Sequence, residues 1–333
     1  MQYMNVKEAS SRWGISERRI RILCSEGRVE GVQRAGWSWN IPVDTPKPGD
    51  GRTLRHLKNF EMRIGSQNFS LLDDYRERFE SAASGVPAEV LAVGVDRLCE
   101  SLCLCTLEDE QVPISAAQLK TIYGGALSVD LPLSSHLLAL NCRSAFRKMF
   151  RDTRFGEACK GSSACHDTPS VEDVRAGRSF WSEQALKDLN RSLLHALDDE
   201  QAGRYRDAEI PAGGAWGGDQ RTFPVFQQME TLFVQYDREW SMLHPLVRAV
   251  FMFGELLRIR PFPNYSVATA WFALSGELMA GGYPPAVLDD GRLAEFRATL
   301  ALTQRRGNYQ GTARMVEESV RHELDSLIRL CQS

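Results

Sequence analysis

The spacing of hydrophobic residues divides the chain into a short head and a long helical body. In residues 1–44, two short helical periods are followed by two apolar stretches on either side of a turn. From about residue 61 onward, apolar residues recur every three or four positions, as on the buried face of amphipathic helices. Residues 45–60 lack this period and hold two prolines and two glycines, a composition typical of a linker. We therefore expect three parts: 1–44, 45–60 and 61–333.

The head has the pattern of helix, turn, helix and hairpin. Asn5 can cap a first helix that ends at Gly14. Ser16 can cap a second helix, Glu17 to Glu26, which a glycine ends. Only a tight turn fits between the two helices, as a helix-turn-helix requires. The expected hairpin has strands Val29–Arg34 and Trp37–Ile41 around a turn at Ala35-Gly36.

This order of elements resembles the small winged DNA-binding domains of the MerR and excisionase type over about residues 3–44. In helix-turn-helix docking, the N-terminal end of the second helix enters the major groove. Arginine there can bind phosphate or the acceptor edge of guanine. The resemblance therefore implies binding to double-stranded DNA; the alternative is a solvated surface on a module that binds protein. The residues expected at the DNA are Ser16, Arg18, Arg19, Arg21, Arg34 and Trp37.

The distribution of charge supports a DNA-binding head. Residues 1–60 hold eleven Lys or Arg against six Asp or Glu, a net charge of +5, so the rest of the chain carries −8 of the total of −3. A basic head on an acidic body indicates that only the head meets a polyanion. One small head makes few phosphate contacts, so we expect a homodimer with two heads.

The remainder of the chain is predicted to be mostly helical, and the fold class mainly α. No apolar run approaches the eighteen residues that a membrane span needs. The first residues also lack the form of a signal peptide, and we expect a cytoplasmic protein without membrane contact. The predicted helices are Leu71–Ala83, Ala88–Leu104, Ala116–Tyr123, Ser134–Phe150, Glu183–Leu197, Pro245–Leu257, Val267–Ala280, Leu293–Leu302 and Ala313–Leu330.

The eight cysteines do not predict a metal site. Several lie in apolar helical segments, where buried free thiols are the ordinary interpretation. Cys103 and Cys105 are too close together for the usual zinc pairing, and Cys159, Cys165 and His166 lack a clear fourth ligand. We expect neither a metal nor another cofactor.

Three groups of residues in the body resemble the Fic domain family over about residues 90–310. They are His244-Pro245-Leu246, the run from Arg258 to Asn264, and Gly281-Gly282-Tyr283-Pro284-Pro285. Members of this family commonly transfer a nucleotide monophosphate to a protein hydroxyl. The resemblance implies an all-helical domain with a small β-hairpin flap.

The family's catalytic motif is His-Pro-Phe-any-Asp/Glu-Gly-Asn-Gly-Arg, with another Arg three residues later. Its His, the general base, falls on Arg260, whose guanidinium stays protonated and cannot accept a proton. Its acidic residue, which helps to hold magnesium, falls on the uncharged Asn264. Its glycines fall on Tyr265 and Val267, which hinder the approach of phosphate to the backbone.

The other chemical positions of the motif are also replaced. Its Asn falls on Ser266, and its two arginines fall on Ala268 and Trp271, so the cations that would neutralise phosphate are missing. Pro261 and Phe262 keep the motif residues, and these belong to the scaffold. The comparison predicts that the motif is catalytically degenerate.

Many Fic proteins carry an inhibitory helix with a Ser/Thr, three residues, then Glu and Gly/Asn. The best match lies in Leu107-Glu108-Asp109-Glu110, with Leu104 in the Ser/Thr place. Glu108 is then the remnant of the inhibitory glutamate, or simply a solvated charge at a helix end. Its arginine partner is absent, because that position is Ala268.

Three functions follow from these patterns. The leading hypothesis is a DNA-binding regulator whose Fic-like body serves dimerisation, or senses a nucleotide-like ligand or protein partner. Arg260 is then either an anion clamp or part of a structural ion pair. The alternatives are a divergent transferase that uses Ser266 or Tyr265, and a protein-interaction scaffold. The nearby imidazoles are His195 and His244, and capping or packing of a helix explains His244.

Overall fold

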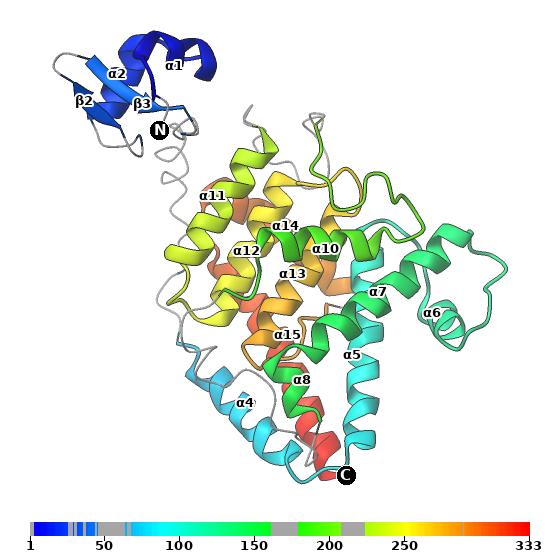
Figure 1. Cartoon of the computed structure of the whole chain (residues 1–333). Helices are drawn as coiled ribbons and strands as arrows, with labels where there is room; N and C mark the ends of the chain where they lie inside the picture. Colours follow the sequence, from blue (N-terminus) through cyan, green and yellow to red (C-terminus); the bar gives the residue numbers. More distant parts are fainter. Residues whose placement is uncertain are drawn as a thin grey trace. The chain divides into compact units, whose positions relative to one another are not determined.

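The chain separates into two compact units, residues 1–61 and 62–333, which we describe separately. Figure 1 shows the elements of both units in the computed structural model. The predicted linker lies almost entirely outside the described residues. The described residues are 3–25, 29, 32–35, 38–43, 45, 64, 68–160, 179–207, 224–288 and 290–333.

The head consists of two helices and a three-stranded antiparallel sheet. Strand β3 lies in the centre of the sheet, between β1 and β2. Met4 pairs with Ile41, and Ala35 pairs with Ser38. The elements are β1 (Tyr3–Met4), α1 (Val6–Trp13), α2 (Glu17–Ser25), β2 (Gln33–Ala35) and β3 (Ser38–Pro42).

Local signals at the first helix act as the sequence predicts. The Asn5 side chain accepts hydrogen bonds from the backbone N–H groups of Lys7 and Glu8, and the Glu8 carboxylate accepts one from the backbone N–H of Asn5. Gly14 ends the helix with φ 63°, a left-handed conformation that suits glycine. The head also has its own apolar core, formed by Met4, Ala9, Trp13, Ile20, Cys24, Val29 and Ile41.

The hairpin departs from the prediction by one residue. Ala35 and Ser38 are paired strand residues, so Ala35 belongs to β2 and not to the predicted turn Ala35-Gly36. Strand β1 was not predicted, because two residues are too short to show a period. The turn residues and the predicted stop at Gly27 lie outside the described part of the chain.

The body is built around two helices that pack against each other, α12 (Pro245–Ile259) and α13 (Ser266–Ala280), which occupy its centre in Figure 1. Every residue of α13 is buried. Long helices surround this pair, and α4 packs along α15. The helices are α4 (Ser70–Ala83), α5 (Ala88–Asp109), α6 (Ala116–Tyr123), α7 (Leu133–Arg151), α8 (Arg154–Ala158), α10 (Glu183–Leu193), α11 (Val225–Arg238), α12 (Pro245–Ile259), α13 (Ser266–Ala280), α14 (Asp290–Arg306) and α15 (Gln310–Gln332).

The prediction of a mainly α fold is confirmed, with corrections at some boundaries. Helix α5 continues five residues past the predicted end at Leu104, and α10 ends at Leu193 instead of Leu197. Helices α8 and α11 were not predicted. The expected β-hairpin flap cannot be placed, because residues 208–223 lie outside the described residues. None of the described helices combines the length and apolar character needed to cross a membrane.

Candidate functional site

The segment that was aligned with the Fic motif, Arg260 to Trp271, lies where α12 ends and α13 begins. Two residues of this connection, Arg260 and Tyr265, have left-handed backbones with φ 46° and 54°. Such angles are uncommon for residues other than glycine, asparagine and aspartate. Tyr265 stands where the family motif has a glycine. The connection therefore keeps a backbone that suits glycine while carrying a tyrosine.

Hydrogen bonds from neighbouring segments hold this connection in place. The Arg206 Nε donates to the carbonyl of Arg260 at 2.7 Å, and its backbone N–H donates to Pro261 at 2.9 Å. Asn190 of α10 donates to the carbonyl of Asn264 at 3.2 Å. Inside the turn, the Ser266 hydroxyl donates to the Phe262 carbonyl at 2.8 Å and accepts from its N–H at 2.9 Å. Ser266 thus has a structural role.

A carboxylate occupies the N-terminal end of α13. Glu110 directly follows α5, and its Oε1 accepts the backbone N–H of Ala268 at 2.7 Å. The N–H of Val267 also interacts with this carboxylate. The first amides of a helix are unpaired within it and attract negative charge. Burial raises the pKa of Glu110, and these two amides act in the opposite direction. The chain thereby supplies its own anion to these amides.

The neighbouring acid, Asp109, binds Trp271, which stands at the position of the motif's second arginine, and Arg297 of α14. Its Oδ2 accepts the indole N–H of Trp271 at 2.7 Å, and its Oδ1 accepts from Nε of Arg297 in α14 at 2.6 Å. Burial raises the pKa of Asp109, while both contacts lower it. The Trp271 ring is fully buried and packs against Phe253 and Phe296. The position has become part of the core.

Arg260 faces these two acids. Burial lowers the pKa of its guanidinium, and the charges of Glu110 and Asp109 raise it. Its Nε is buried without a hydrogen-bond partner among the described residues. An arginine at this position offers positive charge and N–H donors but no proton acceptor. The charges of Glu110 and Asp109 around Arg260 fit the expected structural ion pair, and the Nε donor of Arg260 is left without a partner among the described residues.

The remaining polar groups of the motif are engaged elsewhere or unsuited to transfer. Asn264 donates from its side chain to Asp198 at 3.0 Å. Burial and the charge of Glu110 raise the pKa of Tyr265, which opposes loss of its phenolic proton. Within the described ranges, no three His, Cys, Asp or Glu residues are arranged to hold a metal ion. The residues present therefore do not fit a magnesium-bound nucleotide: the carboxylate ligand is missing, and Glu110 occupies the amides.

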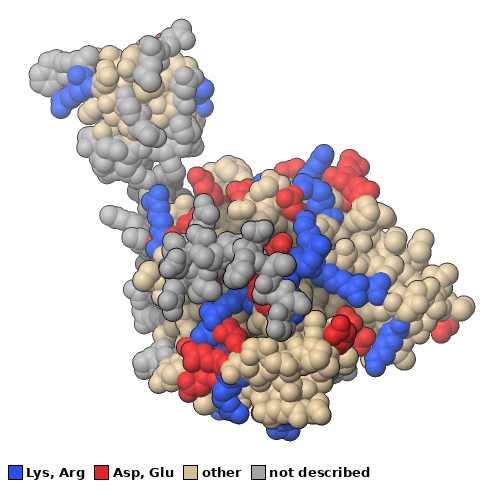
Figure 2. Space-filling view, turned by 60° about the horizontal axis from the view of Figure 1, so that its bottom comes forward, with Lys and Arg blue, Asp and Glu red and all other residues tan. Residues whose placement is uncertain are grey.

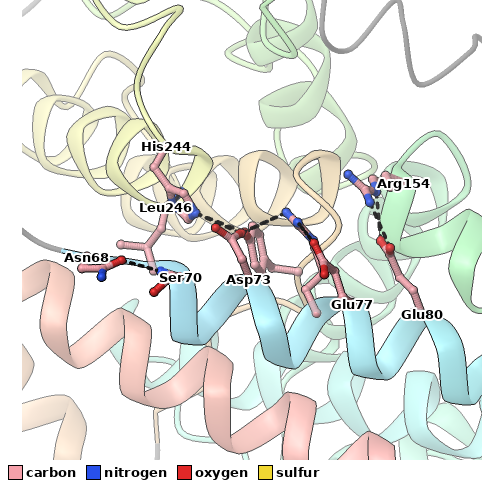
Figure 3. A network of polar contacts seen from close by, with 10 residues as sticks. Asn68, Ser70, Asp73, Glu77, Glu80, Arg154, His244 and Leu246 are labelled. Carbon is pink, nitrogen blue, oxygen red and sulfur yellow. Dashed lines mark hydrogen bonds and ion pairs between the residues drawn. The ribbon is translucent and has the colours of Figure 1, made fainter.

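His244, the other candidate from the sequence, lies at the opposite end of α12. Its Nδ1 accepts the N–H of Leu246 at 3.2 Å, which caps the helix. Its ring stacks on Phe69 with centroids 4.5 Å apart, and Nε2 lies 3.1 Å from the hydroxyl of Tyr283. Figure 3 shows this imidazole pointing toward Asp73 of α4. Burial lowers the pKa of His244, against the influence of Asp73. Capping and packing account for it, as expected.

The sequence drew attention to Glu108, but Asp109 and Glu110 are the acids whose carboxylates contact α13. The signal was the acidic stretch at 108–110, and the position of the helix end decided which acids turn inward. Sequence reasoning also missed Asp109, Arg297 and Asn190. Their partners are far away along the chain, so no local pattern reveals them.

The head residues expected at DNA are only partly described. Ser16 and Arg18 are exposed. Arg21 is exposed and pairs with Glu17 at 2.8 Å. The Arg34 guanidinium lies over the Trp39 ring, 5.4 Å from its centroid. The side chains of Arg19 and Trp37 lie outside the described residues.

Comparisons with known proteins find similar structures but no matching sequence. Comparison with protein-family models gives no match, and neither does comparison with curated proteins. Fic-1 from C. elegans (residues 134–508) superposes with a TM-score of 0.62 at 18% identity, covering 84% of this chain and 75% of that chain. A Fic-domain signaling protein from Bacteroides thetaiotaomicron gives 0.60 at 15%, covering 78% and 96%. A Fic family protein from Desulfovibrio desulfuricans gives 0.51 at 16%, covering 73% and 75%. At these identities the similarity shows the fold alone: the chain has a mainly α, Fic-like fold.

Proposed function

We propose that this protein is a sequence-specific DNA-binding transcriptional regulator. The observation that carries the proposal is an exposed arginine in the first turn of α2, in a compact head. Arg18 is exposed there and has no ion-pair partner within the described part of the chain. Arg21 follows on the same helix, and Arg34 is exposed on the hairpin. A helix with basic residues in its first turn, beside a short hairpin, fits the major groove with the hairpin at the backbone.

The Fic-like body serves this regulator without transferring nucleotides. Three observations support the second part of the proposal. Arg260 cannot act as a base, the Ser266 hydroxyl holds the backbone of Phe262, and Glu110 takes the amides where a phosphate would bind. Each interaction stabilises the folded connection instead of leaving a group free to react. The body then provides dimerisation or sensing of a ligand or protein partner.

A gel-shift titration of the full chain with mixed genomic DNA fragments tests the proposal. We expect retention of all fragments at low salt and of a small subset at physiological salt, because phosphate contacts weaken with salt while base contacts persist. The Arg238→Ala variant is the control: it removes an exposed arginine from α11 of the body and should retain the same fragments as the wild type. A chain that retains no fragment even at low salt is not a DNA-binding regulator.

A further inference from the structure

A pocket of about 350 Å³ opens on the surface of the body between α4, α14 and α15. None of its lining residues belongs to the connection between α12 and α13. Binding sites for small molecules have volumes of about 300–1,000 Å³. Every side chain that lines this pocket carries a polar group, which favours a polar or charged ligand. The lining residues are Tyr75, Arg292, Glu318, Arg321, His322 and Asp325.

The two carboxylates of the pocket are already paired with arginines. Glu318 Oε2 pairs with Arg292 of α14 at 2.9 Å, and its Oε1 pairs with Arg314, one turn earlier in α15, at 3.0 Å. Asp325 Oδ2 pairs with Arg329 at 2.6 Å. Paired in this way, the two acids leave little negative charge for a cationic ligand.

Three donor groups of the pocket have no hydrogen bond or close ion pair within the described part of the chain. They are the Tyr75 hydroxyl of α4 and the Arg321 guanidinium and His322 imidazole of α15. The charge of Arg321 interacts with that of Glu317, one turn earlier. The Arg78 guanidinium lies over the Tyr75 ring, 5.1 Å from its centroid, and adds positive charge. Figure 2 shows basic and acidic residues mixed over the body, so the pairing of its charges distinguishes the pocket.

Contacts between the helices hold the walls of the pocket together. The ion pair of Arg292 with Glu318 joins α14 to α15. The Ser319 hydroxyl donates to the Val287 carbonyl at 2.6 Å and accepts the Val287 N–H at 2.9 Å, which fastens the segment before α14 to α15. Helix α4 packs along α15. Walls fixed in this way keep the donors in place before a ligand arrives, which lowers the entropy cost of binding.

We propose that this pocket binds the phosphate group of a small organic molecule. A phosphate group has three strong acceptor oxygens, one for each of the three donors. Arginine, tyrosine and histidine side chains can all donate to such oxygens, whereas a carboxylate offers two. The pocket has roughly ten times the volume of about 30 Å³ that a water molecule takes up, so the organic part also has room. The inference goes beyond the proposed regulator by giving the body a class of ligand, and it does not depend on DNA binding.

Histidine NMR of the full chain, without DNA, tests the pocket. The chain has six histidines, and the His322→Gln variant identifies the His322 imidazole signal by its absence. We expect glycerol 3-phosphate to shift this signal to saturation with a Kd of about 1 mM, an affinity that a few charge-assisted hydrogen bonds can supply. Malonate at equal ionic strength, which offers carboxylates in place of phosphate, should bind about tenfold more weakly.

Variants of the lining residues identify the donors to the phosphate. Arg321→Ala should raise the Kd for glycerol 3-phosphate about tenfold, the effect of losing one charge-assisted hydrogen bond. Tyr75→Phe removes only a hydroxyl and should raise the Kd by a smaller factor. Arg238→Ala is the control, since it removes an exposed arginine from α11 and should leave the Kd unaltered. Circular dichroism verifies that each variant is folded.

A shift that grows linearly with concentration, equal binding of malonate, or an unaltered Kd in Arg321→Ala overturns the inference. A short DNA duplex that shifts the His322 signal at a lower phosphate concentration than glycerol 3-phosphate also overturns it, because the phosphate then belongs to nucleic acid. Failure of the gel shift alone would refute the regulator and leave the pocket standing.

Discussion

At the scale of single residues, the account depends on where arginine and glutamate side chains lie. In the head, Arg18 is exposed in the first turn of α2 and has no ion pair among the described residues. In the body, the charge of Arg260 interacts with Asp109, which is buried, and with Glu110, which is partly buried. Arginine therefore has different surroundings in the two units, which the sequence alone does not reveal for Arg260.

Arg18→Ala should weaken DNA binding by the full chain. If Arg18 contacts a base edge, the loss should be about 1–3 kcal/mol with relaxed sequence preference; if it contacts phosphate, the slope of affinity against salt should fall instead. Fluorescence anisotropy with labelled operator DNA over a salt series distinguishes the two. Unchanged affinity and unchanged slope would exclude α2 as the helix that meets DNA.

Glu110→Gln should stabilise the body increasingly as pH rises. The folded chain holds the Glu110 proton more tightly than the unfolded chain, because burial raises its pKa. Glu110 therefore contributes its full stabilisation of the folded state at a pH below the usual glutamate pKa. This contribution is lost as the pH rises through the raised pKa of the folded chain. Glutamine keeps an acceptor for the Ala268 N–H and has no proton to lose.

Urea unfolding at several pH values measures this difference. Glu230→Gln is the control, since Glu230 is exposed in the middle of α11. The Glu110→Gln variant and the wild type should have similar free energies of unfolding in acid and should diverge toward neutral pH. A pH-independent difference would show that the charge of Glu110 carries no burial cost.

At the scale of elements, some features of the connection from α12 to α13 could be predicted from the sequence and others could not. The alignment of Arg260 through Trp271 with the motif could be made from sequence, and so could the two helices. The partners that hold the connection could not, because Asn190, Arg206 and Glu110 approach from distant segments. In the head, the local signals at Asn5 and Gly14 sufficed, whereas β1 depends on pairing with β3.

Ser266→Ala should destabilise the body by about 1–3 kcal/mol, the cost of leaving buried polar groups unsatisfied. The N–H and carbonyl of Phe262 both lose the hydroxyl that now pairs with them. Thermal unfolding by calorimetry measures the effect, with the exposed Ser134→Ala in α7 as the control. Equal melting temperatures of the Ser266→Ala variant and the wild type would show that the serine does not hold the connection.

At the scale of the whole molecule, a mainly α, Fic-like body follows a basic head along the chain. The mainly α architecture could be predicted from hydrophobic periodicity. The end of α5 could not, because its last residue, Asp109, is a buried acid whose partners are distant along the chain. That boundary decides which carboxylates reach α13.

We expect no transfer of AMP, UMP or phosphate from labelled nucleotides to the chain itself or to lysate proteins. Loss of a general base costs about 10²–10⁴-fold in rate, and loss of preformed donors to the transition state costs about 10²–10³-fold each. Arg260→His alone should not restore transfer, since Glu110 still occupies the amides of α13. Label that depends on this chain and disappears with Ser266→Ala or Tyr265→Phe would contradict the account.

Selection of genomic DNA by the full chain tests the central claim most directly. Fragments retained at physiological salt are sequenced in parallel for the wild type and Arg18→Ala. The account predicts that the wild type enriches fragments sharing an inverted repeat, since two heads read two half-sites, and that Arg18→Ala loses or relaxes the enrichment. A wild-type chain that enriches no sequence, or one that enriches the same sequences after the change at Arg18, would contradict it.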